Sequence, residues 1–370
     1  MKFYLVGGYV RDSLLGVADE STEKDYVVIG ATEQEMLDKN FIKVGKDFPV
    51  FLHPDTKAEY ALARFEKKVG SGYKGFEFDA SNSITLEEDL YRRDLTINAM
   101  AIDPDDDSII DPFNGQDDLN NGLLRHVSDA FKEDPVRVLR VARFAARFKK
   151  YGFKVSHKTN QFMREMVSND EVSFLTPERV FVELEKSLSY ETPSAFFKVL
   201  LGCGAYHVIF SDLQVPDKEN HENIFTYLDH LENFEPEEKF AFWLSNQDTK
   251  DVERFCVQYK TPKAYSDLAL LTSKWRTFVQ SIVDKSDEEV LEFFSRTDAI
   301  RRSERFHSLV KIYSKMDIDM KLFESLLEQI KQIDIKSLNQ EDIANSLRLK
   351  KILRPPRLIY LLHFEQKFSI

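Results

Sequence analysis

The chain has 370 residues, of which 42% are hydrophobic and 31% charged, and its formal net charge is −12 at pH 7. This length allows two or three hydrophobic cores, and no apolar run is long enough to cross a membrane as a helix. Only two cysteines, Cys203 and Cys256, are present. They are too few for a disulfide framework, so we expect a protein of the reducing cytoplasm.

The first predicted elements are a strand over residues 3–6 and a helix that follows two glycines. Gly7 and Gly8 leave backbone N–H groups open, so a polyphosphate can sit there without a side chain in the way. Arg11 lies one helical turn further on, within reach of the same phosphates. A simple tight turn is the structural alternative, because the pattern is neither the dinucleotide fingerprint nor the P-loop.

Two acidic residues stand at the start of the next apolar run, residues 26–29. Because side chains alternate between the faces of a strand, we expect Glu23 and Asp25 to project together. Mg²⁺ binds through one or two carboxylates plus substrate phosphates, so the pair predicts a magnesium site, with a solvated turn as the alternative. The order strand, Gly-Gly, helix with an arginine, and strand with two carboxylates favours nucleotidyl transfer.

A further polar segment, residues 92–99, follows a helix whose start at Thr85 has the capping-box pattern. Its Arg93 is a candidate for holding a triphosphate. Asp94 and Asn98 are candidates for contacting a ribose hydroxyl. An ordinary salt-bridged surface is the alternative for this segment.

The alternation of strands and helices predicts an α+β protein. Short apolar runs predict strands over residues 3–6, 26–29, 50–52, 60–63, 100–102 and 109–110, and the acidic residues 103–107 predict a hairpin turn. After Arg125 helical periodicity continues to the end. We therefore expect an α/β head at 1–124, a helical neck at 125–214 and a helical body and tail at 215–370.

Four arginines gather on one face of the helix predicted after residue 135. At about 100° per residue, Arg137, Arg140, Arg143 and Arg147 cover about a third of its circumference. Residues 125–164 hold eleven Lys or Arg against three Asp or Glu, a local net charge of +8 on an acidic chain. Such a stripe can steer a polyanion to one face, and we expect it to contact nucleotide and RNA.

Asp134 and Arg137 together offer one acceptor and a set of donors. These match the Watson–Crick edges of cytosine and adenine, whereas guanine and uracil present a keto oxygen where Asp134 needs a donor. A buried unpaired polar group makes such refusal strong. The pair thus predicts selection of C and A by protein alone, and helix capping is the alternative role of Asp134.

With these motifs the chain resembles the class II tRNA nucleotidyltransferases, the bacterial CCA-adding enzymes of the polymerase β superfamily. The segments that carry the resemblance are residues 5–12, 23–25, 64–68, 70–73, 92–99, 111–115, 133–143 and 176–180. The resemblance implies a polymerase β-like head and template-independent addition of C and A to the 3′ end of tRNA. It implies CTP and ATP as substrates, tRNA as partner and Mg²⁺ as cofactor.

The resemblance also implies the roles of individual residues. Glu23 and Asp25 hold the metal, and the nucleotide-binding residues are Gly8, Arg11, Arg93, Asp134, Arg137, Arg140 and Arg143. The segment from Lys67 to Phe76 is expected to be the flexible element that lets the pocket switch from CTP to ATP.

Two departures from the family pattern stand out. The family usually has Asp where this chain has Glu23, which is one methylene longer. Many relatives also carry a histidine-aspartate phosphohydrolase domain, but this chain contains no His-Asp dipeptide. Residues 239–248 look like a degenerate form of that metal-binding helix, so we expect no metal-ligand role for His221 or His230.

Three alternatives stay open. A bacterial poly(A) polymerase shares the head motifs, but a basic RNA-binding extension is expected there, whereas residues 210–260 hold five Lys or Arg against twelve Asp or Glu. An enzyme that adds only CC or only A is a second alternative. The third is an inactive tRNA-binding module, against which the retention of Asp25, Arg93, Asp134 and Arg137 argues.

Overall fold

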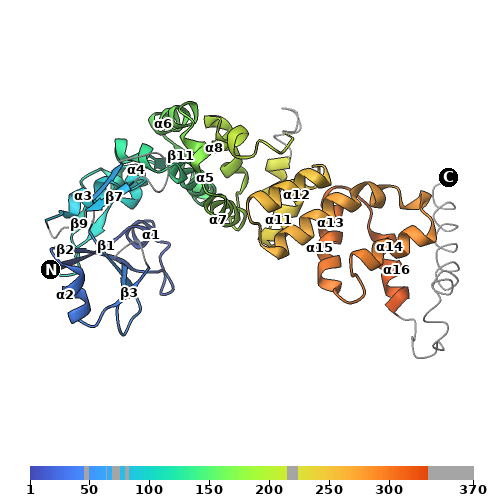
Figure 1. The fold of residues 1–370 in the computed structure, drawn as a ribbon, viewed down its shortest axis with the longest axis horizontal. Coiled ribbons are helices and arrows are strands. Elements are labelled where there is room, and N and C mark those ends of the chain that lie inside the picture. Colours follow the sequence, from blue (N-terminus) through green and yellow to red (C-terminus); the bar gives the residue numbers. More distant parts are fainter. Residues whose placement is uncertain (46–49, 64, 69–75, 80–82, 215–223, 332–370) are drawn as a thin grey trace. The chain divides into compact units, whose positions relative to one another are not determined.

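The computed structural model describes residues 1–45, 50–63, 65–68, 76–79, 83–214 and 224–331. The chain forms two compact units (Figure 1): the first consists of Met1–Ser211 and Lys218–Glu232, and the second of Asp212–Asp217 and Asn233–Ile370. The regions expected as head and neck both lie in the first unit, apart from residues 212–214. The domain limits at 124/125 and 214/215 stay predictions.

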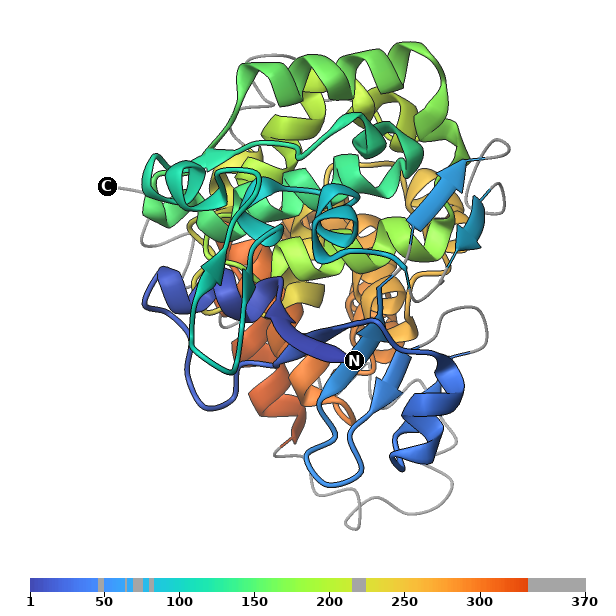
Figure 2. The ribbon, with the colours of Figure 1, turned by 90° about the vertical axis from the view of Figure 1, so that its left-hand side faces the viewer.

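A seven-stranded sheet organises the head. Its order is β3 (Ile42–Val44), β4 (Val50–Leu52), β5 (Glu59–Leu62), β2 (Asp25–Ile29), β1 (Lys2–Val6), β8 (Ala101–Ile102) and β9 (Ile109–Ile110). Only β2 and β5 run parallel, and the other neighbours are antiparallel. All six predicted strands occur, β3 was not predicted, and the predicted turn at 103–107 joins β8 to β9. Figure 2 shows the ribbon with this part of the chain toward the viewer.

Each face of the sheet has its own apolar core, as strand alternation requires. Val27 packs in one buried cluster with Val6 and Leu90, and the next residue, Val28, packs in another with Phe51. Apolar side chains therefore cover both faces of the sheet. The end of β1 lies beside the start of β2, where Val6 pairs with Asp25.

The head has four helices, of which α2 and α3 begin with a capping box. They are α1 (Gly8–Leu14), α2 (Glu33–Asp38), α3 (Leu86–Tyr91) and α4 (Gly115–Asn120). Thr85 accepts from the Glu88 backbone N–H while the Glu88 carboxylate accepts from that of Thr85, so the predicted capping box is confirmed. Strands β6 (Phe65–Lys68) and β7 (Phe76–Asp79) form a separate antiparallel pair. Residues 69–75 of the predicted switch segment lie outside the described residues.

The neck is built around one central helix. Its helices are α5 (Val136–Phe148), α6 (His157–Ser168), α7 (Pro177–Leu188), α8 (Ser194–Cys203) and α9 (Ala205–Ile209). Helix α5 packs against both α7 and α8 (Figure 1). The expectation that strands end at Arg125 is wrong in one detail, because β10 (Leu123–Leu124) pairs in parallel with β11 (Lys154–Val155).

The second unit is helical and has an aromatic core. Its described helices are α11 (Pro236–Leu244), α12 (Thr249–Gln258), α13 (Lys263–Gln280), α14 (Asp287–Arg296), α15 (Ser303–Lys315) and α16 (Lys321–Lys331). Helix α11 contains most of the segment expected to be a degenerate metal helix. There Phe240 packs on Trp243, Phe255 and Tyr265. In the described part of the chain, no helix is long and apolar enough to cross a membrane.

Candidate active site

The turn between β1 and α1 is shaped by two glycines. Gly7 has φ +71°, a left-handed conformation that side chains disfavour. A Cβ atom on Gly7 would lie 3.2 Å from Nη1 of Arg93, and one on Gly8 would lie 3.6 Å from Nη2 of Arg11. The structure therefore brings both guanidinium groups against this turn, as a triphosphate site requires.

Arg11 is buried and anchored on three sides. Its Nε and Nη2 donate to the two carboxylate oxygens of Asp12 at 2.8 and 2.9 Å, and its Nη1 donates to Oδ1 of Asn98 at 2.5 Å. Its guanidinium carbon also lies about 5 Å from the ring centres of Phe144 and Phe148. Burial lowers the pKa of Arg11, and Asp12 opposes that change.

Arg93 is oriented by a buried carboxylate. Asp89 accepts from Nη2 of Arg93 at 3.1 Å and from Nη2 of Arg92 at 2.5 Å. Burial alone would raise the pKa of Asp89, but the two arginines hold it below its ordinary value. An ionised Asp89 thus holds Arg93 in place beside Gly7.

The carboxylates gather at the starts of β2 and β5. Asp25 and Glu59, the first residues of these two strands, are direct partners in the parallel register. Partial desolvation and the neighbouring Glu59 and Glu23 raise the pKa of Asp25, and Arg93 opposes this. The strand-alternation argument for Glu23 is wrong, because β2 begins at Asp25 and Glu23 lies exposed in the loop before it.

This excess of negative charge fits a divalent cation. Among the described residues, no group of three His, Cys, Asp or Glu side chains could hold a metal ion by itself. Mg²⁺ usually keeps several waters and takes its remaining ligands from one or two carboxylates and substrate phosphates. Asp25, with Glu23 and Glu59 nearby, suits that kind of site.

Asp94 uses both carboxylate oxygens within the protein. Oδ1 accepts from the Leu95 backbone N–H and from Nδ2 of Asn98, and Oδ2 accepts from Nε of Arg140 at 2.7 Å. Burial would raise the pKa of Asp94, but Arg140 and Asn98 hold it well below its ordinary range. Oδ2, which accepts one hydrogen bond, is the oxygen with room for a ribose hydroxyl.

The arginine face of α5 is not the open basic stripe that the sequence suggested. Arg137 donates to the carbonyl oxygens of Ala130 and Arg92 at 2.7 and 2.6 Å. The other three bind carboxylates: Arg140 binds Asp94, Arg143 binds Glu183, and Arg147 binds Asp12. These ion pairs join α5 to the head and to α7.

Asp134 has the carboxylate that sequence reasoning assigned to base selection. It accepts from Nη1 and Nη2 of Arg179 at 3.0 and 2.7 Å. It also accepts from the Val136 backbone N–H at 3.0 Å, so it does bond to the first turn of α5. The structure therefore shows the capping contact together with a partner, Arg179, that the sequence reasoning missed.

Comparisons with known proteins decide the family. A family model described as the poly A polymerase head domain matches residues 3–125, and one described as the probable RNA and SrmB-binding site of polymerase A matches residues 152–215. The CCA-adding enzyme of Coxiella burnetii is 42% identical over 358 residues, which cover 95% of this chain and 93% of the relative. The multifunctional CCA protein of Pseudoalteromonas atlantica is 44% identical, with 84% of each chain covered.

The chain belongs to the CCA-adding enzyme family. It is therefore a tRNA nucleotidyltransferase, and this family generally uses divalent metal ions. A solved structure described as CCA-adding enzyme apo form II has the same fold, with a TM-score of 0.70 at 22% identity, covering 96% of this chain and 87% of that one. The predicted polymerase β-like head with a helical body is confirmed at the level of the fold.

The structure brings out three residues that sequence reasoning did not single out. Glu59 lies beside Asp25 because β2 and β5 pair in parallel, and no local pattern in the sequence predicts that pairing. Asp12 binds both Arg11 and Arg147. Arg179 lies within the segment 176–180 that carried the resemblance, but its ion pair with Asp134 spans 45 residues of sequence.

Proposed function

We propose that this chain adds C, C and A in turn to the 3′ end of tRNA, using CTP and ATP and releasing pyrophosphate. One observation carries the proposal. The guanidinium groups of Arg11 and Arg93 lie at the Gly7–Gly8 turn, and Arg93 also acts on Asp25 at the start of β2. The 42% identity to a CCA-adding enzyme across almost the whole chain supports the same activity.

The protein's part in the reaction is to place groups for an in-line displacement. Arg11 and Arg93 hold the triphosphate over Gly8, so that the 3′-hydroxyl of the RNA attacks the α-phosphorus while the bond to the β-phosphate breaks. Glu23 and Asp25 are the proposed Mg²⁺ ligands, with Asp25 the better placed. Divalent ions held by these carboxylates would lower the pKa of the attacking hydroxyl and neutralise the leaving pyrophosphate.

The proposed base-reading residues already have protein partners. Asp134 is held by its bidentate pair with Arg179, and its Oδ2, which accepts one hydrogen bond, has room for the amino group of C or A. Arg137 donates to two carbonyl oxygens, so contact with a ring nitrogen uses another of its N–H donors or replaces one of these partners. Asn98 and Asp94 remain candidates for the ribose, and Arg140 and Arg143 for the nucleotide.

Stepwise incorporation tests the proposed function. The purified chain is incubated with tRNAs that end before the CCA, after the first C or after the second C, with one labelled triphosphate at a time and Mg²⁺. We expect CTP to extend the first two tRNAs and ATP the third, with no use of UTP or GTP. Long adenosine tracts from ATP alone would identify a poly(A) polymerase instead.

Two controls complete this test. The Asp25→Ala variant is expected to leave every tRNA unextended, which ties incorporation to this site. Replacement of Mg²⁺ by a chelator is expected to do the same. The tRNA substrate and the two buried, unpaired cysteines are compatible with the cytoplasmic location expected from the sequence, which we retain as a proposal.

A further inference from the structure

An arginine of the neck, to which the proposed mechanism gives no role, is bonded to the residue that holds Arg11. Nη2 of Arg147, in the last turn of α5, donates to Oδ2 of Asp12 at 2.8 Å. The same oxygen accepts from Nη2 of Arg11 at 2.9 Å, so one carboxylate joins the two guanidinium groups. Asp12 is buried, and the ring centre of Phe148 lies 5.0 and 5.1 Å from the two guanidinium carbons. Burial of this kind limits the screening of these contacts by solvent and salt.

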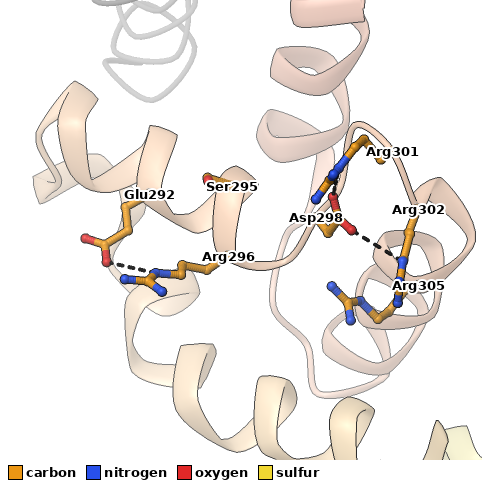
Figure 3. Close-up of a pocket in the computed structure, with 7 residues that line it drawn as sticks. All are labelled: Glu292, Ser295, Arg296, Asp298, Arg301, Arg302 and Arg305. Carbon is orange, nitrogen blue, oxygen red and sulfur yellow. Dashed lines mark hydrogen bonds and ion pairs between the residues drawn. The ribbon is translucent and has the colours of Figure 1, made fainter. Parts of the chain in front are cut away.

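The Arg147–Asp12 pair is long-range and shielded, unlike the arginine pairs of the second unit that Figure 3 shows. There Arg296, Arg301 and Arg302 pair with carboxylates three or four residues away, and their side chains are 65% to 85% exposed. The side chains of Arg147 and Asp12 are 33% and 6% exposed. Exposed local pairs usually contribute little, whereas removing one partner of a buried carboxylate leaves that carboxylate uncompensated.

Asp12 needs an anchor outside α1 in order to hold Arg11. Adjacent residues of a helix do not face each other, so the two side chains meet only when both are turned toward a common side. Within the part of the chain that the structure describes, Arg147 is the one side chain beyond α1 that bonds to the Asp12 carboxylate. Asp12 and Asn98 together take three N–H groups of Arg11, which leaves one on each Nη. Nη2 lies beside Gly8, where a Cβ atom would be 3.6 Å away.

A second connection reaches Arg11 from the same helix. Nε of Arg140 donates to Oδ2 of Asp94, and Oδ1 of Asp94 accepts from Nδ2 of Asn98. Oδ1 of Asn98 in turn accepts from Nη1 of Arg11. Arg11 is thus connected to α5 at two points that lie two helical turns, or about 10 Å, apart. Loss of the Arg147 connection leaves the Asn98 connection in place, so it would disturb the orientation of Arg11 without releasing the side chain.

We propose that Arg147 is a positioning residue for the triphosphate, which orients Arg11 through Asp12 and so sets the affinity for the phosphate part of CTP and ATP. The role of Arg11 in this inference rests on the proposed function. Two guanidinium groups and the carboxylate between them leave one net positive charge, which attracts a polyphosphate. Because an α-helix rises about 1.5 Å per residue, Arg147 lies about 15 Å along α5 from Arg137 and should not affect the choice of base.

A charge-matched pair of variants of the whole chain tests the proposal. Arg147→Gln removes the cation that binds the buried Asp12. Lys2→Gln removes the cation that binds Asp103, a carboxylate of similar burial at 2.6 Å, and Lys2 begins β1 at the opposite end from Gly7. Calorimetry with Mg²⁺ and without tRNA gives the dissociation constants of CTP and of inorganic tripolyphosphate. Incorporation assays give the relative use of the four nucleoside triphosphates.

We expect Arg147→Gln to weaken the binding of CTP and tripolyphosphate by the same factor, about three- to tenfold, and to keep the preference for C and A. Lys2→Gln should leave both dissociation constants unchanged. Arg147→Lys, which keeps a cation for Asp12, should restore most of the affinity. Unchanged tripolyphosphate binding in Arg147→Gln, or equal losses in Arg147→Gln and Lys2→Gln, would overturn the proposal.

A double variant shows whether Asp12 transmits the effect. If Arg147 acts through Asp12, Asp12→Asn/Arg147→Gln should bind tripolyphosphate no more weakly than Asp12→Asn alone. Fully additive losses would mean that Arg147 contacts the phosphates itself and would overturn the positioning role. If Asp12→Asn does not fold, the comparison of Arg147→Gln with Arg147→Lys and Lys2→Gln decides. Calorimetry needs no catalysis, so a chain that binds tripolyphosphate in an Arg147-dependent manner but adds no nucleotide would refute the proposed function and leave this inference intact.

Discussion

Asp25 lies at the point where three acidic side chains and Arg93 influence one another. Repulsion among these carboxylates destabilises the folded chain. Repulsive groups of this kind are typical of functional sites, where a bound ligand offsets them. The sequence predicted Glu23 and Asp25 from their spacing. It could not predict Glu59, whose position depends on a parallel pairing between strands thirty residues apart.

Neutralising Asp25 should separate stability from activity. We expect Asp25→Asn to raise the melting temperature measured without divalent ions, because it removes one of the neighbouring carboxylates, and to abolish nucleotide incorporation. Glu20→Gln, at an exposed acidic residue before the site, should change neither property. A less stable Asp25→Asn chain would show that Asp25 is held mainly by Arg93 and is not destabilised by its neighbours.

Glu23 is expected to tolerate shortening. Glu23→Asp restores the carboxylate that the family usually has, and the exposed loop before β2 leaves room to adjust. Incorporation of CTP should stay within about threefold of the unsubstituted chain, a change worth less than about 0.7 kcal/mol in activation free energy. Complete loss of incorporation by Glu23→Asp would argue that the loop geometry is built around the longer side chain.

Asp134 should control the choice of base. We expect Asp134→Ala to weaken the use of CTP and ATP by about ten- to a hundredfold, since one hydrogen bond to a charged group contributes roughly 1.5 to 3 kcal/mol. Relative use of UTP and GTP should rise. Arg179→Ala removes the partner of Asp134 and keeps the carboxylate, so it serves as the matched variant. Unchanged base preference in Asp134→Ala would reduce its role to the bond with Val136.

Helix α5 shows what periodicity predicts and what it misses. The pattern of apolar residues predicted a helix from about residue 136, and the structure has it at Val136–Phe148. The arginine face looked like a ligand surface because its partners Asp12, Asp94 and Glu183 lie between 40 and 135 residues away in the sequence. Only tertiary structure reveals that Arg140 and Arg147 join the neck to the head and that Arg143 joins α5 to α7.

The Asp94–Arg140 pair should give this junction a measurable pH dependence. The folded-state pKa of Asp94 lies below its ordinary value, so the pair stabilises the fold above the unfolded pKa of about 3.9 and this stability is lost as the pH falls. We expect Asp94→Asn to cost about 2 kcal/mol in urea unfolding at pH 7. The difference from the unsubstituted chain should shrink at pH 3.5.

A matched variant for this measurement is Asp107→Asn. Asp107 is exposed in the β8–β9 turn at φ +56°, a conformation that Asn also tolerates. Its substitution should leave unfolding free energies nearly unchanged at both pH values. A cost for Asp94→Asn that is the same at pH 7 and pH 3.5 would mean that hydrogen bonding by Asp94, rather than its charge, stabilises the junction.

The whole molecule divides after the neck, and each unit has a core of its own. We expect a chain of residues 1–232 to unfold cooperatively and to keep CTP binding, because the buried clusters of the sheet and the packing around α5 all lie within it. It should bind tRNA more weakly than the full chain. Thermal unfolding and CTP titration check this, and a chain that does not fold would show that the second unit is required.

At this scale, sequence patterns predicted the α+β class and the order of regions, because alternating strands and helices leave clear periodicities. They did not predict which side chains form the hydrophobic core of the second unit. There the segment 239–248 supplies the aromatic residues Phe240 and Trp243 to a core instead of metal ligands to a surface. The identity of a core depends on which helices meet, which local patterns do not encode.

The most direct test of the central claim is to sequence the 3′ ends of a tRNA lacking CCA after incubation with all four triphosphates and Mg²⁺. The account predicts that nearly all extended ends read CCA and stop there, and that the Asp25→Ala variant leaves the ends unextended. Ends that stop at CC, run on into adenosine tracts or contain U or G, or ends extended equally by Asp25→Ala, would contradict it.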